Sequence, residues 1–275
     1  MLKDITFGQY YPSSSFVHRL DPRIKILLLT AYIVAVFLSA NFAALALVCV
    51  FLVVAIAFSS VPILSVIRSL KAIIFLVVLT FLLNVFFYAK KEGDTTLFWV
   101  VTKEGLIGAT FLSSRLLLLV AGSSLLTLTT TPVSLTDGLE SLLKPLTYVK
   151  FPVHELALIM SIALRFIPTL ADETDRIILA QKARGADFDS GNIFRRAKAF
   201  VPVLIPLLVS AFRRADELGN AMDARCYSGS KNRTKYKKLT FTVRDVVAVV
   251  FTAAFVTGIV FANIYYVRIL AFIGL

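Results

Sequence analysis

The chain has 275 residues, of which 58% are hydrophobic, and its mean hydropathy is +0.82. One water-soluble core of this size could not hide so much apolar surface, which excludes an ordinary soluble globular protein. Charged residues still make up 17% of the chain and leave a net charge of +12, so part of it must meet water or lipid headgroups. The composition therefore predicts an all-α membrane protein with a substantial polar part.

The first 25 residues are polar and aromatic, with no short apolar stretch before a small-residue cleavage site, so we expect no cleaved signal peptide. Five apolar stretches then follow whose lengths suit helices that cross a hydrocarbon core of about 30 Å. A short uncharged link around Asn41 joins the first two, which predicts a tight hairpin. The five predicted spans are residues 24–40, 42–58, 72–88, 110–130 and 245–263.

Lysine and arginine collect on alternate sides of these spans. They flank the first span, lie between the second and third at Arg68 and Lys71, and are frequent after the fourth. The loop between the third and fourth spans, residues 89–109, balances its basic residues with acidic ones. Because basic loops stay in the cytoplasm, we expect a cytoplasmic N-terminus and an extracellular C-terminus.

Most of the excess positive charge lies between the fourth and fifth spans. Two long helices are predicted there, from Glu155 to Arg184 with a kink at Pro168, and from Ile193 to about Arg225. Their apolar runs, residues 156–167 and 199–212, are each shorter than a span and are followed by dense charge. We therefore interpret them as amphipathic or covered by a partner. A loop rich in Ser, Gly and Lys follows at residues 227–238.

The sequence thus divides into three parts. Residues 1–131 form an N-terminal membrane region with four spans, residues 132–244 form a cytoplasmic region of long helices, and residues 245–275 form a C-terminal span. The predicted fold is all-α, with about five transmembrane helices and long cytoplasmic amphipathic helices.

The two long helices end in the same way, with a small residue followed by arginine. A single such end would be explained by capping, because a cation complements the helix dipole and glycine supplies a left-handed cap. The repetition favours docking, since alanine keeps the end slim and arginine offers a planar fork of donors. We expect Cys226, which lacks the freedom of glycine, to make the second end geometrically distinct. The two motifs are Ala183-Arg184-Gly185 and Ala224-Arg225-Cys226.

Together with a pre-helix pattern, these motifs resemble a known family, the transmembrane T components of energy-coupling factor (ECF) transporters, which are relatives of ABC importers. The family signature is Ala-Arg-Gly on each of two cytoplasmic helices. The first motif matches it fully, and the second departs from it at Cys226. The resemblance covers essentially the whole chain. The pre-helix pattern reads Gly8-Gln9-Tyr10-Tyr11-Pro12, followed by His18-Arg19-Leu20-Asp21-Pro22-Arg23-Ile24-Lys25.

This resemblance implies a non-enzymatic subunit of a bacterial cell membrane importer that joins two ABC ATPase subunits to a substrate-binding S component carrying a vitamin or other micronutrient. Each Ala-Arg motif would end a coupling helix that docks into one ATPase. ATP and Mg would be bound by the ATPases, and no cofactor by this chain. The apolar parts of the two helices would form the platform for the S component: Leu156, Ile159, Ile162, Ala163, Phe166, Leu170, Val201, Leu204, Leu208 and Phe212.

Other functions fit the sequence less well. It contains neither the phosphate-binding Gly-x-x-x-x-Gly-Lys-Ser/Thr run nor a dinucleotide glycine fingerprint, which argues against an ATPase or a dehydrogenase. A self-sufficient secondary transporter stays open as an alternative, although such proteins more often carry ionisable residues at mid-bilayer. Nucleic acid is not an expected partner, because the basic residues of the polar part are interleaved with acidic ones.

Metal binding and disulfide formation are not expected either. His18 and His154 lie far apart in the sequence, with no Cys or carboxylate cluster at ligand spacing. Two cysteines alone, Cys49 in an apolar run and Cys226 in a basic segment, imply no disulfide framework. We expect both to be free thiols.

Overall fold

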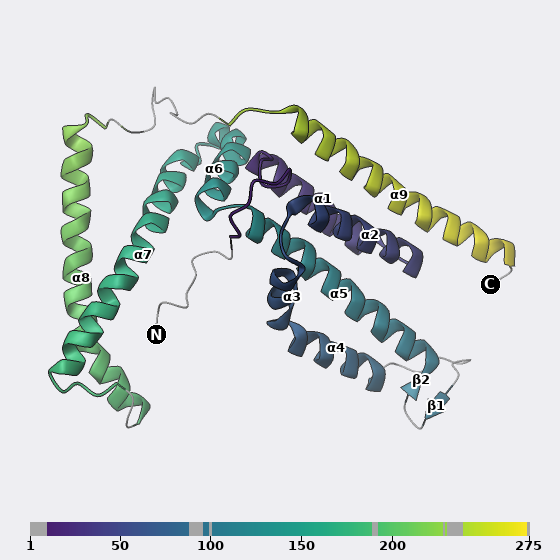
Figure 1. The fold of residues 1–275 in the computed structure, drawn as a ribbon, viewed down its shortest axis with the longest axis horizontal. Coiled ribbons are helices and arrows are strands. Elements are labelled where there is room, and N and C mark those ends of the chain that lie inside the picture. Colours follow the sequence, from purple (N-terminus) through teal and green to yellow (C-terminus); the bar gives the residue numbers. More distant parts are fainter. Residues whose placement is uncertain are drawn as a thin grey trace. The chain divides into compact units, whose positions relative to one another are not determined.

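The computed structural model describes residues 10–87, 96–98, 101–188, 192–227, 229 and 239–273. Over these residues the chain is almost wholly helical, which confirms the all-α membrane class (Figure 1). It divides into two compact units, one within residues 8–139 and 239–275, the other within residues 140–238. We call them the membrane unit and the helix-pair unit. The three-part division of the sequence stays a prediction.

Four helices form the body of the membrane unit. They are α1 (Pro22–Leu38), α2 (Phe42–Ser59), α5 (Lys103–Thr129) and α9 (Val243–Ile273), and α1 and α2 each pack against both α5 and α9. These helices agree with four of the five predicted spans. The link between α1 and α2 is short, as predicted, since α1 ends at Leu38 and α2 begins at Phe42. Asn41 caps α2 by accepting a 2.7 Å hydrogen bond from the amide of Ala44.

The third predicted span is wrong in its form. Instead of one helix over residues 72–88, the chain forms α3 (Ile63–Lys71) and α4 (Ile74–Phe86), which meet at a bend of 60°. The 13 residues of α4 reach only about 20 Å, so this helix alone is too short to cross the hydrocarbon core. Arg68 and Lys71, predicted to lie in a connection, form the last turn of α3.

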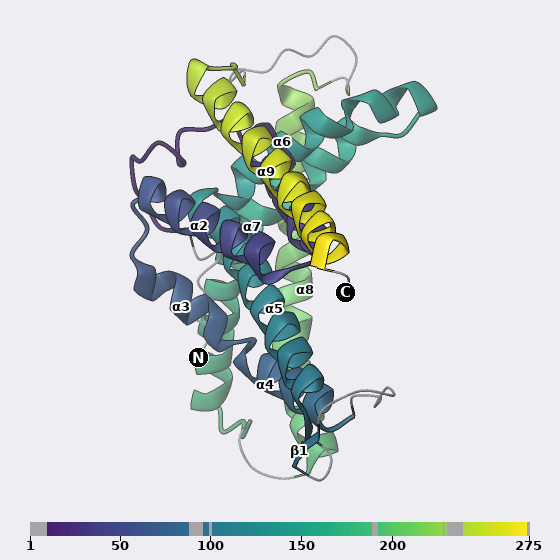
Figure 2. The ribbon, with the colours of Figure 1, turned by 90° about the vertical axis from the view of Figure 1, so that its right-hand side faces the viewer.

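Two short antiparallel strands, β1 (Thr96–Phe98) and β2 (Val101–Thr102), precede α5. The Thr102 hydroxyl caps α5 by accepting from the amide of Gly105 at 3.2 Å. Lys90 and Lys91 of the predicted outer loop, like Tyr88, lie outside the described residues. Both α3 and α4 pack against α5, and Figures 1 and 2 show α4 running beside it. After α5 come α6 (Pro132–Leu143) and a short 3-10 helix (Lys144–Val149).

The core of the membrane unit depends on a close approach of α1 and α5. Tyr32 is buried and its hydroxyl donates to the carbonyl of Leu118 at 2.7 Å. A Cβ atom on Gly122 would lie 2.1 Å from the Tyr32 ring, so only glycine leaves room for the aromatic side chain. Around this contact the two helices pack with α2 and α9 through Ala35, Val36, Val48, Phe255 and Ile259.

Polar side chains tie the helix ends together on one side of the membrane unit. The buried Lys25 ammonium donates to the carbonyls of His18 and Thr129 and to the Thr130 hydroxyl, at 2.9 to 3.2 Å. Asp245, at the start of α9, accepts 2.8 Å hydrogen bonds from the amides of Asp21 and Thr242. The pre-helix segment is thereby joined to α1, α5 and α9.

The other end of α1 is joined to α9 and α5 in the same manner. Asn263 donates to the carbonyl of Leu38 at 2.7 Å, and its side-chain oxygen lies 3.3 Å from the amide of Ala40. The guanidinium of Arg115 donates to the carbonyl of Ser39, just beyond the end of α1, and lies over the Phe111 ring. Side chains thus satisfy backbone groups that the end of α1 would otherwise leave unpaired.

Among the described residues, four helices are long and apolar enough to cross a membrane, and five if the bent α3–α4 pair counts as one span. They are α2, α5, α9 and α7 (Val153–Ala183). The prediction that the apolar part of α7 is shorter than a span was wrong. It counted only residues 156–167, whereas the helix begins at Val153 and continues through Pro168. At 17 residues, α1 is one residue shorter than α2 and much shorter than the other three helices.

Replacing Asp245 by alanine is expected to destabilise the membrane unit. The change leaves two amide groups without an acceptor, at about 1 to 3 kcal/mol each, so the free energy of unfolding should fall by about 2 to 6 kcal/mol. SDS titration of the purified protein, followed by circular dichroism, measures this loss. Asp216→Ala, at an exposed position of the other unit, is the control. Equal stability of the two variants would show that the Asp245 contacts contribute nothing.

Candidate functional site

The helix-pair unit is built on α7 and α8 (Ile193–Ala224), which run antiparallel. The contacts between them set this direction. Gln181 donates to the carbonyl of Pro202 at 3.5 Å, whereas Glu173 forms a 2.6 Å ion pair with Arg214, so positions rise on one helix as they fall on the other. Both helices closely match the two predicted from the sequence. They contain Pro168, Pro202 and Pro206 without a break.

The end of α7 closes on its own backbone. Arg184 occupies the C-cap, Gly185 follows with φ of +86°, and the amides of Gly185 and Ala186 donate to the carbonyls of Lys182 and Gln181 at 3.0 Å. This pair of bonds is the Schellman motif, which satisfies carbonyls that a helix end would otherwise leave unpaired. The backbone alone stops the helix, and the Arg184 side chain is not needed for the cap.

The end of α8 has the same geometry, which corrects the expectation that Cys226 makes it distinct. Arg225 is the C-cap, and the amides of Cys226 and Tyr227 donate to the carbonyls of Asp223 and Met222 at 2.9 and 3.1 Å. Cys226 itself takes the left-handed conformation, with φ of +56°. Hydrogen bonds of the cap therefore outweigh the steric cost of a Cβ in this region, about 1 to 2 kcal/mol.

Both motifs are exposed, and they lie at opposite ends of the pair. Ala183, Arg184 and Gly185 are exposed, as are Ala224, Arg225 and Cys226. Gln181 contacts Pro202, and from there α8 continues for 225 − 202 = 23 residues to Arg225. At about 1.5 Å per residue, the two arginines are separated by roughly 35 Å. Both motifs belong to the helix-pair unit, but they are too far apart to contact the same ligand.

The predicted platform residues fall into two groups that the structure does not bring together. The register places residues 201–212 of α8 beside about residues 173–181 of α7, whereas residues 156–170 of α7 lie beyond Glu173, toward the Arg225 end. Each end of the pair therefore combines one arginine with one apolar surface. Three of the predicted residues are half-buried: Ile162, Phe166 and Leu170. The others are exposed: Leu156, Ile159, Ala163, Val201, Leu204, Leu208 and Phe212.

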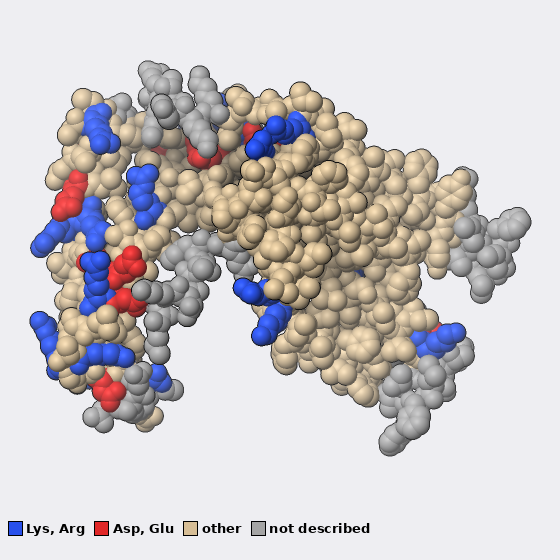
Figure 3. Space-filling model, viewed as in Figure 1, with Lys and Arg blue, Asp and Glu red and all other residues tan. Residues whose placement is uncertain are grey.

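A polar groove between the two helices was not predicted from the sequence. It has a volume of about 440 Å³, and the Glu173–Arg214 ion pair lies on its wall together with Asp172 and Arg176. Charged runs in the middle of both helices were visible in the sequence, but only the antiparallel register shows which residues face each other. Figure 3 shows basic and acidic side chains side by side on this unit.

Near the start of α7, His154 is joined to Glu140 of α6 through a 3.0 Å contact between Nδ1 and Oε1. His18 lies elsewhere, between Ser15 and the carbonyl of Tyr11. The described residues hold no group of three or more His, Cys, Asp or Glu side chains that could bind a metal ion. Both cysteines are free thiols.

Comparison with known proteins decides the family. Residues 13–236 match the family model described as cobalt transport protein, CbiQ. Proteins named energy-coupling factor transporter transmembrane protein EcfT are similar over nearly their whole length. The one from Ruminiclostridium cellulolyticum is 49% identical over 94% of this chain and 97% of its own, and that from Clostridium kluyveri 51% over 90% and 93%. The Bacillus subtilis protein is 47% identical over 91% and 95%.

The chain belongs to the family of ECF transporter T components. A T component is a multi-pass transmembrane part of a transporter and is not itself an enzyme. The apolar helices of the membrane unit agree with this assignment. Within this T component, the helix pair with its two exposed Ala-Arg ends is the candidate functional site.

Restoring glycine at the second motif should stabilise the end of α8. Cys226→Gly removes the steric cost of the left-handed conformation, so we expect the last turn to gain about 1 kcal/mol, while a β-branched valine should cost at least as much. Hydrogen exchange of the Tyr227 amide, which bonds to Met222, measures both changes. Gly185→Ala is the matched variant at the first motif. Slower exchange in the valine variant than in the glycine variant would contradict the cap geometry.

Proposed function

We propose that this T component transmits ATP-driven motion by docking Arg184 and Arg225 into two separate ABC ATPase subunits. The observation that carries the proposal is that two antiparallel helices end in the same backbone cap, each presenting an exposed arginine, about 35 Å apart. A single groove on one ATPase could not hold two equivalent helix ends that lie so far apart. Two ATPase subunits side by side would give each end its own groove.

The closed caps make the arginines available to a partner. Because backbone bonds satisfy the last carbonyls of both helices, neither guanidinium is required to cap its own helix. Arginine can then bind a carboxylate in a groove through two parallel hydrogen bonds, while Ala183 and Ala224 leave the helix ends narrow. Docked ends of this kind would move with the ATPases when ATP brings them together.

The apolar surfaces of the helix pair are proposed as the platform for the S component. Exposed apolar side chains on a helix pair require lipid or another protein to cover them. On α8, Leu204, Leu208 and Phe212 are exposed by 57 to 64%, on the stretch that precedes Arg213 and Arg214. A membrane-embedded S component carrying a vitamin or other micronutrient would cover such a surface, and tilting of the docked helices would shift it.

We place ATP and Mg on the ATPases and no cofactor on this chain. The proposed location is the bacterial cell membrane, with the N-terminus and the helix pair in the cytoplasm and the C-terminus outside, as the basic residues indicate. Cysteines introduced at Lys231 and Leu275, in a variant without Cys49 and Cys226, test this orientation. A membrane-impermeant reagent added to intact cells should label only the cysteine at position 275.

The docking proposal is tested by reversing the two charges. Losing a buried, hydrogen-bonded charge pair costs about 2 to 5 kcal/mol, whereas losing a cation that only complements a helix dipole costs at most about 1 kcal/mol. Arg184→Glu and Arg225→Glu should each weaken ATPase association by about thirtyfold or more and sharply reduce uptake. Surface plasmon resonance of the purified subunits measures the association.

Arg213→Glu, at an exposed position in the middle of α8, is the matched control and should change association little. Because both motifs are exposed, the variants should insert into the membrane and fold like the wild type. If the two ends serve different ATPases, each single variant should loosen a different subunit. Wild-type recovery of both ATPases with the double variant would show that the arginines do not dock into the ATPases.

A further inference from the structure

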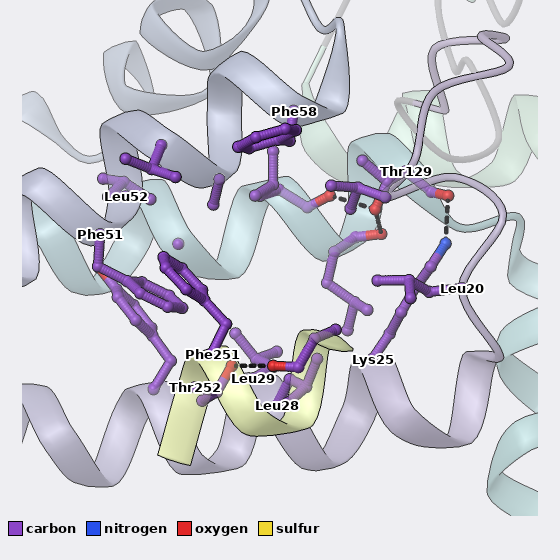
Figure 4. Close-up of a pocket in the computed structure, with 18 of the residues that line it drawn as sticks. Leu20, Lys25, Leu28, Leu29, Phe51, Leu52, Phe58, Thr129, Phe251 and Thr252 are labelled. Atoms are coloured by element: carbon purple, nitrogen blue, oxygen red, sulfur yellow. Dashed lines mark hydrogen bonds between the residues drawn. The ribbon is translucent and has the colours of Figure 1, made fainter. Parts of the chain in front are cut away.

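The membrane unit contains an apolar cavity that the proposed function does not use. It has a volume of about 350 Å³ and is partly open to the outside. Figure 4 shows side chains that line it. Its walls come from the pre-helix segment, α1, α2, α5 and α9. The side chains around it include Leu20, Leu28, Leu29, Phe51, Leu52, Phe58, Leu125 and Phe251.

The polar atoms on the cavity wall already have partners. Lys25 donates to three oxygens, the Tyr32 hydroxyl to Leu118, and the hydroxyls of Thr129 and Thr252 to the carbonyls of Leu125 and Ala248. These bonds use the donor hydrogens of those side chains, so a polar vitamin or a chain of water molecules would find few polar partners on an otherwise apolar wall. An apolar occupant suits such a wall best.

The volume of the cavity limits the shape of that occupant. An apolar cavity of about 150 Å³ holds a molecule such as benzene, and this one is more than twice as large. A partner helix about 10 Å wide takes up roughly 420 Å³ per turn, so not even one turn would fit. A single flexible chain fits the space.

The cavity opens beside exposed apolar side chains of α2 and α9. Phe58 at the end of α2, and Val247 and Phe251 near the start of α9, line the cavity and are also exposed by 61%, 54% and 48%. Protein interiors are packed as densely as organic crystals, so an empty space of this size forfeits the contacts of its lining. In a membrane, lipid tails surround the protein and are available to fill this space.

We propose that this cavity binds one acyl chain of a membrane lipid, which enters between α2 and α9 and completes the packing of the membrane unit. The favourable term is the recovery of van der Waals contacts rather than removal from water, since the chain leaves one hydrocarbon environment for another. Recognition is by shape and does not select a headgroup.

Photolabelling of the full chain in phospholipid nanodiscs tests the proposal. A phosphatidylglycerol and a phosphatidylcholine, each with a diazirine in the middle of one acyl chain, should both label peptides that contain residues 51–58 and 247–252. A diazirine fatty acid in a parallel sample identifies the source of the chain. Stronger labelling by the phospholipids assigns a phospholipid tail, and stronger labelling by the fatty acid assigns a free one.

Two alanines on the wall allow the cavity to be filled by design. Ala55→Phe with Ala248→Phe should reduce labelling by about tenfold, because the added rings take up the space. Ala57→Phe with Ala253→Phe, at exposed positions on the same helices, is the matched control and should leave labelling unchanged. Equal labelling of the filled variant and the control, or labelling spread evenly over the exposed helices, would overturn the proposal.

A second measurement guards against a filled variant that fails to fold. Delipidation in detergent should lower the Tm of the wild type, and re-addition of phosphatidylglycerol should restore it. In the filled variant the Tm should depend much less on lipid, since phenylalanine rings replace the chain. An unchanged lipid dependence in a folded variant would also overturn the proposal. ATPase association is unaffected by either outcome, so the docking proposal is tested separately.

Discussion

The structure depends on giving hydrogen-bond partners to the backbone groups at the helix ends, because hydrocarbon contains no water to bind an unpaired amide or carbonyl. The membrane unit meets the constraint by tying ends of different helices together. Lys25 donates to the Thr129 carbonyl and the Thr130 hydroxyl at the end of α5 and to the His18 carbonyl of the pre-helix segment. Asp245 accepts from the amides that precede α1 and α9. On the other side, Asn263 and Arg115 serve the end of α1.

The helix pair meets the same constraint in the opposite way. Both α7 and α8 close their last turns with their own backbone, through one residue in the left-handed conformation. Nothing from a neighbouring helix is needed, so the ends can stand exposed and can present arginine to a partner. The antiparallel register then gives each end of the pair one arginine and one apolar surface. In the proposed mechanism, a push on either arginine acts on a rigid helix whose apolar part lies at the far end.

Sequence and structure agree best where the pattern is local. Hydrophobic length predicts α2, α5 and α9, and charge after an apolar start predicts the long helices to within two residues. The bend between α3 and α4 was not predicted because the two residues that join them, Ala72 and Ile73, are neither proline nor glycine and so give no sign of a helix end. The cap at Cys226 was misjudged because its hydrogen bonds come from backbone geometry that residue type alone does not reveal. Contacts between distant segments, such as Glu173–Arg214 and Asp21–Asp245, require the register of the packed helices.

Separate docking of the two helix ends is the central claim, and site-specific photo-cross-linking tests it most directly. A diazirine-bearing lysine placed at Ala186, next to the first motif, and in a second sample at Ala221, near the second, would be activated in the assembled transporter. The account predicts that each position cross-links to an ATPase and that the two positions reach different ATPase subunits. Cross-links from both positions to one ATPase copy, or to the substrate-binding component alone, would contradict it.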